Sequence, residues 1–318
     1  MSNSVCVTGG AGFIGSHLVG ELLERGNSVI VIDDFSTGKR QNLRNYRDQI
    51  ELVEMDIRNG DRLREVFDGV EEVYHQAAMP SVPISMESPV LSTDITLMGS
   101  VQVFSAASQT DVRRIVFASS SSIYGENTEL PKVEEMESLP ASPYAASKRS
   151  VEIFARVFSQ KFDVETVGLR YFNVFGPRQD PDSDYAAVIP AFITAYLSHS
   201  SPVIYGDGEQ SRDFTFVSDV VKANLLAMRE GTPGKTYNVG YNDQTTVNEL
   251  ADMLRTLIGV DVEPRYDSPR PGDVRHSRAD TSLFTRDTGF DPLYDVKSGL
   301  KETVQWYQEN PGWWKQGE

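Results

Sequence analysis

The chain has 318 residues, of which 39% are hydrophobic, and a formal net charge of −16. This length allows one large domain or two closely packed ones. The excess of acidic residues argues against nucleic-acid binding, which needs a basic face. An anionic substrate would have to be bound by a few well-positioned arginines. The first residues lead directly into an apolar segment, and no apolar run approaches the roughly 20 residues of a membrane span. We therefore expect neither a signal peptide nor a membrane helix.

The single cysteine, Cys6, lies inside the first apolar segment and can form no disulfide within the chain. This use of cysteine is typical of a reducing cytoplasm, where we expect the protein, and it predicts a core thiol. The four histidines lack the spacing of metal ligands, so no metal is expected. His75 follows a buried strand and is expected in the core.

In chain order, the first half alternates short β-branched runs with longer amphipathic segments. Strands are predicted at residues 4–8, 28–33, 50–54, 72–75, 114–118 and 164–170. Helices are predicted at residues 12–25, 62–67, 89–108 and 143–162. Such alternation predicts βαβ units, and therefore an α/β fold with a Rossmann-type, doubly wound parallel sheet.

After Phe175 the pattern loosens. Further helices are predicted at residues 186–197, 218–228, 247–258 and 297–308, and short strands at 203–205, 236–239 and 262–265. We therefore expect a dinucleotide-binding domain at 1–175, which also receives strands from the C-terminal half, and a smaller mixed substrate lobe at 176–318.

Three glycines follow the first strand with the spacing GxxGxxG. Gly9 permits a sharp turn, Gly12 permits the backbone to approach a pyrophosphate, and Gly15 permits close packing of the helix on the sheet. The second strand ends at Asp33, whose carboxylate can accept hydrogen bonds from ribose hydroxyls and would repel a 2′-phosphate. The loop and the acid together favour NAD over NADP.

Tyr144 and Lys148 form a YxxxK pair, which places the phenol and the ammonium on one face of a helix. An adjacent cation is expected to lower the pKa of the phenol, so that Tyr144 can act as a general base. About two dozen residues earlier, a run of serines ends a predicted buried strand. Because ligands bind at the carboxyl ends of such strands, a serine hydroxyl there can contact the same substrate oxygen.

Together, the GxxGxxG, SSSxxYG and YxxxK motifs resemble the extended short-chain dehydrogenase/reductase family over nearly the whole chain. The resemblance implies that Ser120 and Tyr144 are catalytic and that Lys148 tunes Tyr144 and binds the nicotinamide ribose. It implies that NAD stays tightly bound and contacts Gly9, Gly12, Phe13, Ile14, Gly15, Asp33, Asp56, Ile57, Gln76, Ala77, Ala78, Tyr144 and Lys148.

The C-terminal half resembles the UDP-sugar branch of that family, through the segment 171–177, through Arg212 and through Arg270-Pro-Gly-Asp273. The implied contacts with a UDP-sugar are Ser81, Ser121, Ser122, Asn173, Val188, Tyr205, Arg212, Arg270, Asp273 and Ser277. Two arginines at the diphosphate would suit this acidic chain. Ser277 is implied to face carbon 2 of the sugar. One departure is Thr96, which stands where the family usually has an Asn, and it puts the family's proton relay in doubt.

The two serines at 121 and 122 indicate which reaction the resemblance implies. Related dehydratases carry Asp-Glu where this chain has Ser121-Ser122, and the decarboxylases carry a Glu at Ser122, so elimination lacks its acid here. A 4-keto sugar would then be reduced again on its other face, which is epimerisation at carbon 4. The resemblance is nearest to UDP-N-acetylglucosamine 4-epimerases of surface-polysaccharide synthesis, and then to UDP-glucose 4-epimerases.

Several alternatives remain open. A UDP-glucuronate 4-epimerase or decarboxylase shares the scaffold, a dehydrogenase would release NADH, and a non-catalytic NAD sensor would normally lack Tyr144 or Lys148. Family members also pair two helices into a homodimer. The apolar positions expected to do so here are Val101, Val103, Phe104, Ala107, Val151, Phe154, Ala155 and Phe158.

Overall fold

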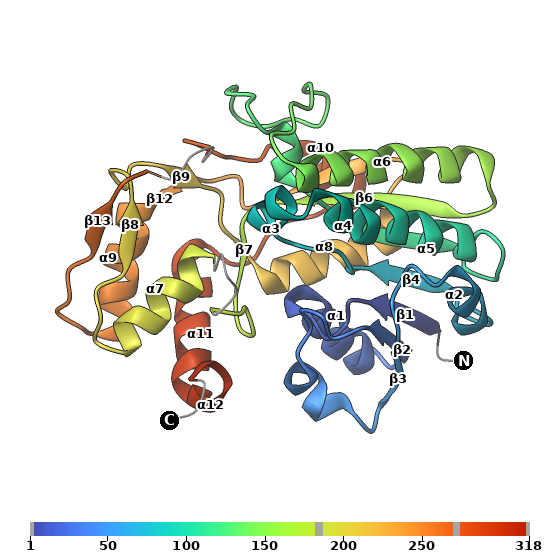
Figure 1. The fold of residues 1–318 in the computed structure, drawn as a ribbon, viewed down its shortest axis with the longest axis horizontal. Coiled ribbons are helices and arrows are strands. Elements are labelled where there is room, and N and C mark those ends of the chain that lie inside the picture. Colours follow the sequence, from blue (N-terminus) through green and yellow to red (C-terminus); the bar gives the residue numbers. More distant parts are fainter. Residues whose placement is uncertain (1–2, 182–186, 270–273, 316–318) are drawn as a thin grey trace.

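A seven-stranded parallel sheet forms the centre of the computed structural model, which describes residues 3–181, 187–269 and 274–315 (Figure 1). The strand order is β11-β6-β5-β4-β1-β2-β3, and every pairing is parallel. The strands are β1 (Ser4–Thr8), β2 (Ser28–Asp33), β3 (Ile50–Glu54), β4 (Glu72–His75), β5 (Arg114–Ser120), β6 (Glu165–Tyr171) and β11 (Thr236–Val239). The expected α/β, doubly wound fold is confirmed.

The direction of winding reverses at β1. The chain first adds β2 and β3 on one side of β1 and then β4, β5 and β6 on the other. In sheets of this kind, ligands bind outside the carboxyl ends of the strands where the order reverses. Here those ends are followed by Gly9 after β1 and by Gln76 after β4.

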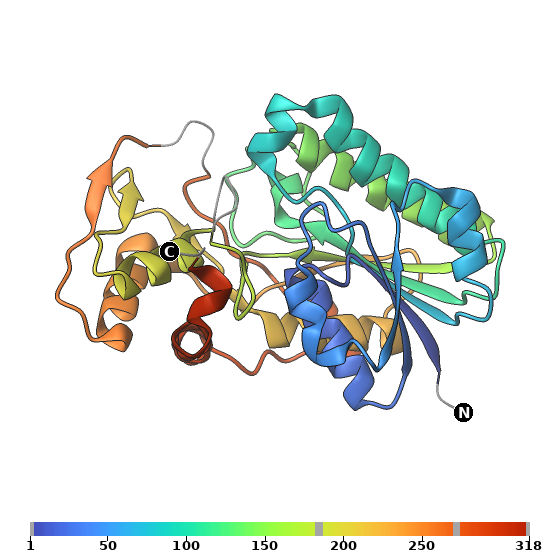
Figure 2. The same cartoon turned by 60° about the horizontal axis from the view of Figure 1, so that its bottom comes forward.

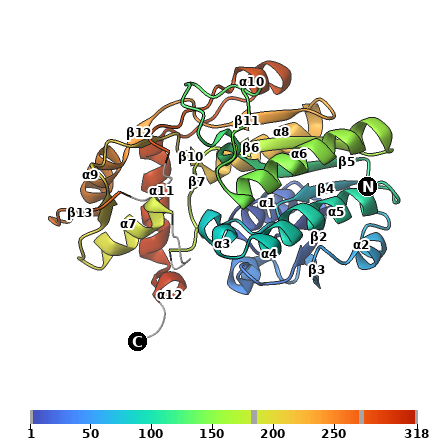
Figure 3. The same ribbon diagram turned by 45° about the horizontal axis from the view of Figure 1, so that its top comes forward.

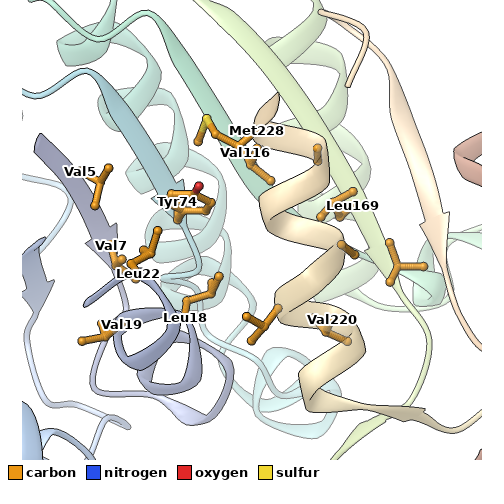
Figure 4. Close-up of a cluster of buried hydrophobic side chains, with 14 of the residues drawn as sticks. Val5, Val7, Leu18, Val19, Leu22, Tyr74, Val116, Leu169, Val220 and Met228 are labelled. Carbon is orange, nitrogen blue, oxygen red and sulfur yellow. The ribbon is translucent and has the colours of Figure 1, made fainter. Parts of the chain in front are cut away.

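Helices cover both faces of the sheet. One face carries α1 (Phe13–Glu24) and α8 (Val217–Glu230). Figure 4 shows the core on that face, where Leu18 and Leu22 of α1 and Val220 of α8 lie against strand residues such as Val5 and Val116. The opposite face carries α2 (Gly60–Val66), α5 (Gly99–Ala107) and α6 (Pro143–Lys161).

The helix predicted at 89–108 is a continuous run of three pieces. These are α4 (Pro89–Thr93), a π-helical turn η2 (Asp94–Met98) and α5. The run is 19 residues long with a mean hydropathy of 1.2, so the expectation that no apolar run approaches the length of a membrane span was wrong. The helices α2 and α6 pack against this run, as expected for a core helix.

The C-terminal lobe has its own core and lies beside the carboxyl ends of the strands (Figures 2 and 3). Its helices are α7 (Val188–Leu197), α9 (Val247–Ile258), α11 (Val296–Glu309) and α12 (Pro311–Trp314). A capping box between Thr246 and Glu249 starts α9, and Gly259, with φ of +76°, ends it. The short strands pair in twos, β8 (Val203–Tyr205) with β13 (Arg265–Asp267), β9 (Ser211–Arg212) with β12 (Thr245–Thr246), and β7 (Val174–Phe175) with β10 (Thr215–Phe216).

Several boundaries differ from those predicted. The strand β5 continues to Ser120, and the strand expected at 262–265 is instead β13. Besides the serine turn that follows β5, described below, four short helical segments among the described residues were missed, because each is too short to show a 3.6-residue period. They are η1 (Arg40–Tyr46), α3 (Val82–Glu87), α10 (Ser282–Thr288) and α12.

Candidate active site

The glycine loop after β1 is packed so closely that side chains are excluded. A Cβ on Gly9, whose φ is +68°, would lie 2.7 Å from the backbone nitrogen of Ala77, and one on Gly15 would lie 2.1 Å from the carbonyl oxygen of Gly9. The helix α1 then begins at Phe13, and the first amides of a helix have no acceptor within it. Such a helix start suits a pyrophosphate, which is the group that the sequence places here.

Asp33 is fixed next to this loop at the end of β2. Its carboxylate accepts hydrogen bonds from the backbone of Ala11, over 2.8 Å, and of Phe35, over 2.9 Å. Burial raises the pKa of Asp33, and these backbone bonds oppose the rise. A carboxylate has about four acceptor positions, so two remain for ribose hydroxyls. The loop and the acid therefore fit a dinucleotide.

Asp56 and Ile57 lie in the loop after β3. The Asp56 carboxylate accepts from the backbone of Arg58, over 2.8 Å, and from its guanidinium, which lowers the pKa of Asp56. Ile57 is buried, and a Cβ on Gly99 would lie 2.6 Å from its Cδ1. Asp56 is thus already a loop cap with an ion pair, and its contact with NAD stays a prediction.

The residues after β4 are held by a polar network. Gln76 donates to Asn224 of α8 and accepts from the hydroxyl of Tyr171, each over 3.1 Å. His75 pairs its Nδ1 with Thr8, over 2.7 Å, and its Nε2 with Ser100, over 2.9 Å. Burial lowers the pKa of His75 to about 3, so the ring is neutral. The network holds in place the turn Gln76-Ala77-Ala78, which lies against Gly9.

The three expected catalytic side chains meet at the ends of β5 and α6. Ser142 caps α6 through the backbone nitrogen of Ala145, and Pro143 occupies the first turn, so that Tyr144 and Lys148 follow on one face. The hydroxyl groups of Ser120 and Tyr144 are hydrogen-bonded. The ammonium of Lys148 donates to the carbonyl of Ala118, over 2.8 Å, and lies 5.9 Å from the centre of the Tyr144 ring.

The electrostatics of this group differ from the sequence expectation in one respect. Burial raises the pKa of Tyr144, and the hydrogen bond to Ser120 only partly opposes it. Burial also lowers the pKa of Lys148 to about 8, against the attraction of Glu152. The expectation that the cation of Lys148 lowers the pKa of Tyr144 does not hold, because loss of hydration on burial outweighs the neighbouring charge.

The serines after β5 form a 3-10 turn, η3 (Ser121–Tyr124), in which the backbone of Ser122 donates to the Ser120 hydroxyl over 3.1 Å. Within the described residues, the hydroxyl oxygen of Ser122 is buried and has no hydrogen-bond partner. Buried hydroxyls are normally paired, so the unpaired hydroxyl of Ser122 is an exception beside the catalytic residues. No acidic side chain occupies either position of Ser121-Ser122.

Of the expected sugar-nucleotide residues, Arg212 and Ser277 lie on adjacent segments. The segment 275–277 runs beside β9, with the backbone of Ser277 donating to Ser211 over 3.1 Å and Arg212 donating to the Arg275 carbonyl over 3.2 Å. Asn173 has φ of +24°, which is strained for a residue with a side chain and is often found at functional sites.

The remaining expected contacts lie on separate elements. Ser81 caps α3 through the backbone of Ile84, over 3.2 Å, while Val188 begins α7 and Tyr205 ends β8. Arg270 and Asp273 lie outside the described residues.

Thr96, the departure from the family pattern, is buried in the π-helical turn η2. Its hydroxyl accepts from the backbone of Met79, over 3.3 Å, and its carbonyl accepts from Ser100, over 2.6 Å. The hydroxyl thus ties this helix to the segment that follows β4.

Sequence reasoning missed a charged group directly behind the catalytic residues. Glu152 follows Lys148 by one turn, and it pairs with Arg170 of β6 and with the hydroxyl of Ser119. The only signal in the sequence was a glutamate four residues after the lysine. Among residues 3–181, 187–269 and 274–315, no three His, Cys, Asp or Glu side chains gather as a metal site would require.

The sequence profile of the NAD dependent epimerase/dehydratase family matches residues 5–240. A UDP-N-acetylglucosamine 4-epimerase from Methanobrevibacter ruminantium M1, solved with UDP-N-acetylmuramic acid, is 40% identical, with a TM-score of 0.93 over 98% of this chain and 100% of that one. A UDP-glucose 4-epimerase from Thermotoga maritima, solved with UDP-glucose, is 37% identical, with a TM-score of 0.93 over 97% of this chain and 99% of that one.

A relative with a different activity is also similar. A UDP-N-acetyl-alpha-D-glucosaminuronate decarboxylase from Bacillus cytotoxicus is 32% identical over 97% of this chain and 99% of its own length. With the Rossmann-type sheet, the glycine loop and the matched profile, this chain belongs to the NAD-dependent epimerase/dehydratase family.

Proposed function

We propose that this protein inverts carbon 4 of a UDP-hexose, acting on UDP-GlcNAc and UDP-GalNAc, and that it also accepts UDP-glucose and UDP-galactose. The observation that carries the proposal is the meeting of Ser120, Tyr144 and Lys148 beside a serine turn that holds no acid. Expelling a hydroxyl group from the sugar needs a general acid, and neutral serines do not supply one.

Each side chain has a distinct task in this scheme. Tyr144 takes the proton of the 4-hydroxyl and later returns it, and Ser120 holds the same oxygen by a hydrogen bond. Lys148 supplies a positive charge beside the phenol, which favours the ionised form of Tyr144 against the effect of burial. NAD, which the glycine loop and Asp33 would hold, would supply reversible hydride transfer at carbon 4 and would be regenerated in each turnover.

The N-acetyl preference is supported by the small side chain of Ser277. The segment 275–280 is extended and is bridged to Ser211 on one side and to Lys132 on the other. Alternate residues of an extended chain share a side, so we expect Ser277 to face the same way as Ala279. Ala279 packs with Ile123, which lies within the serine turn η3. A hydroxymethyl group on that side leaves room for an acetamido group.

A homodimer is part of the proposal, but its surface differs from the one expected. Val103, Phe104, Ala107, Val151, Ala155 and Phe158 are buried within the single chain against the sheet, so they cannot face a partner. A different group of apolar side chains is exposed on α3, α4, η2 and α6, which contact one another. This outer patch consists of Met86, Val90, Leu91, Met98, Ile153, Phe154 and Val157. Only Phe154 belongs to the predicted set.

The patch supports dimerisation because single chains seldom expose so many neighbouring apolar side chains. Val90 is 82% exposed and Met86 is 61% exposed.

Cys6 is buried and reduced, in line with the proposed cytoplasmic location. The charge of −16 supports the absence of a nucleic-acid partner.

The experiment that tests the reaction is incubation of the purified protein with UDP-GlcNAc, UDP-glucose and UDP-glucuronate, followed by separation of the products. Interconversion of UDP-GlcNAc and UDP-GalNAc without net NADH formation is expected, and the denatured protein should release NAD. Turnover of UDP-glucuronate alone, or release of carbon dioxide, would replace the proposal by an activity of the uronate type. Accumulation of free NADH would replace it by a dehydrogenase.

A further inference from the structure

The loop that fits the dinucleotide phosphates is tied to the C-terminal end of the chain. The carbonyl of Ala11, in the middle of the glycine loop, accepts two hydrogen bonds from the segment before β3. One comes from the backbone of Lys39, over 3.0 Å, and the other from the side-chain amide of Asn42, over 2.9 Å. The amide of Ala11 donates to Asp33. Both the amide and the carbonyl of Ala11 are therefore held by hydrogen bonds to residues outside the glycine loop.

The side chain of Asn42 makes a second contact, in the opposite direction. Its Oδ1 accepts from the indole nitrogen of Trp313, over 3.1 Å. Trp313 lies in α12, 271 residues away in the sequence, and both side chains are buried. One amide thus bridges the loop and the last helix of the other lobe, using its donor on Ala11 and its acceptor on Trp313.

Lys39 makes a second connection between the glycine loop and the C-terminal lobe. The ammonium of Lys39 lies 4.6 Å from the centre of the Trp313 ring and forms an ion pair with Asp180, over 2.7 Å. Lys39 therefore reaches the C-terminal lobe with its side chain while its backbone holds Ala11. Phe13 and Ile14, which directly follow the glycine loop, also pack against the core of that lobe. The glycine loop is thus connected to the C-terminal lobe in three ways, through Asn42, through Lys39 and through the packing of Phe13 and Ile14.

We propose that Trp313 and Asn42 are positioning residues for NAD, which hold the glycine loop in its binding shape from the C-terminal lobe and so slow the release of the cofactor. A backbone loop held in place loses less freedom when a ligand binds, and the ligand then binds more tightly. An enzyme that regenerates NAD in each turnover must not lose NADH between the two hydride transfers. The inference depends on NAD as the cofactor and is independent of which sugar is the substrate.

The chain supplies a matched control for this role. Trp314 is the next residue, is exposed to the same 8% as Trp313, and also donates its indole hydrogen, to the carbonyl of Tyr307 over 2.9 Å. That bond stays within the C-terminal lobe. Trp313→Phe and Trp314→Phe therefore each remove one buried hydrogen bond and part of one ring, but only the first disconnects α12 from the glycine loop.

The experiment measures how fast NAD leaves the purified holoenzyme, by trapping released cofactor and by assaying the NAD content after gel filtration. Trp313→Phe should release NAD about three- to tenfold faster than wild type, the ratio expected for one hydrogen bond. Trp314→Phe should release it at the wild-type rate, although both variants should lose similar thermal stability. Equal release from both variants would mean that Trp313 acts only through overall stability, and would overturn the proposal.

A second variant tests whether the effect passes through Asn42. Asn42→Ala removes both bonds of the bridge and should speed release at least as much as Trp313→Phe does. The double variant should then be no faster than Asn42→Ala alone, because the indole has lost its acceptor. Additive effects in the double variant would refute the bridge, and so would a wild-type rate in Asn42→Ala. Neither measurement requires turnover of any sugar nucleotide, so failure of the proposed reaction leaves this test unaffected.

Discussion

The hydroxyl of Ser119 donates a 2.6 Å hydrogen bond to the carboxylate of Glu152. Ser119 directly precedes Ser120, and Glu152 lies one helical turn after Lys148, so the bond joins the two elements that carry the proposed catalytic residues. The same carboxylate accepts from Nε and Nη2 of Arg170, over 2.9 Å each, and the side chains of Arg170 and Glu152 are 4% and 2% exposed.

Glu152→Gln should therefore be strongly destabilising. The change leaves the Arg170 cation buried without its counter-charge, and breaking a buried pair from one side typically costs ~3–5 kcal/mol. Urea unfolding at pH 7 measures the loss. Arg149→Gln is the control, because Arg149 pairs with the same carboxylate but is 35% exposed, so its loss should stay below ~1 kcal/mol. Equal losses of unfolding free energy in the two variants would show that the buried pair stabilises the protein no more than the exposed pair does.

The contribution of Glu152 should also depend on pH in a defined direction. Hydrogen bonds from Arg170 help to hold the pKa of Glu152 below its usual value against the opposing effect of burial. A lowered pKa means that the stabilisation is complete above the pKa of an unfolded Glu, near ~4.3, and is lost as the pH falls through the folded value. The gap in unfolding free energy between wild type and Glu152→Gln should thus narrow in acid. A gap that is constant down to the acid unfolding transition would contradict this assignment.

Lys148 should make stability rise with pH in the alkaline range as well. Burial lowers its pKa to about 8, whereas an unfolded lysine has a pKa near ~10.4. Between these values the unfolded chain binds more protons than the folded one, so stability should rise with pH across that window. Urea unfolding of the cofactor-free protein should show this rise, and Lys148→Met should lack it. If stability rises with pH in Lys148→Met as it does in wild type, the rise must come from another titratable group.

Tyr144→Phe should abolish turnover while leaving sugar-nucleotide binding nearly unchanged. Only the phenolic oxygen is removed, and a positioned acid–base group contributes ~10²–10⁴-fold to the rate. Product analysis and calorimetric binding of UDP-GlcNAc are the two measurements. Turnover at the wild-type level in this variant would exclude the proposed mechanism.

The proposed dimer predicts that one charge on the outer patch separates the subunits. Val157 is 44% exposed on α6, and an aspartate there would be buried without a partner in a dimer. Val157→Asp should be monomeric by light scattering at micromolar concentration. Leu293→Asp is the control, because Leu293 is 70% exposed but lies outside the patch. A monomeric wild-type protein would refute the pairing.

The sequence alone predicted the sheet well because its strands are continuous β-branched runs between recognisable turns. The residues alone predicted that Tyr144 and Lys148 share a helix face near a serine at the end of a buried strand, and the family resemblance singled out Ser120 among those serines. It could not identify which helix faces are exposed. Phe104 and Phe158 are apolar in the sequence just as Val157 is, yet the sheet covers the first two and leaves the third open.

Long-range polar contacts were also beyond sequence reasoning. Nothing in the local sequence relates Asn42 to Trp313 across 271 residues, or Ser119 to Glu152 across 33. The pKa of Tyr144 was misjudged for a similar reason, since the sequence shows the neighbouring lysine but does not show how deeply the phenol is buried.

Ser277 should decide which sugars the enzyme accepts. Under the proposed function its side chain lies beside carbon 2, where a hydroxymethyl group leaves room for an acetamido group and a phenol ring would not. Ser277→Tyr should therefore abolish or greatly weaken epimerisation of UDP-GlcNAc while UDP-glucose turnover survives. The loss should exceed the ~1–3 kcal/mol by which a single methylene discriminates, because a whole ring is inserted. Parallel kcat/KM measurements on both substrates test this, with Ser277→Ala, which keeps the space open, as the control. Equal losses on both substrates would show that Ser277 does not line the pocket, and the N-acetyl preference would then lose its main support.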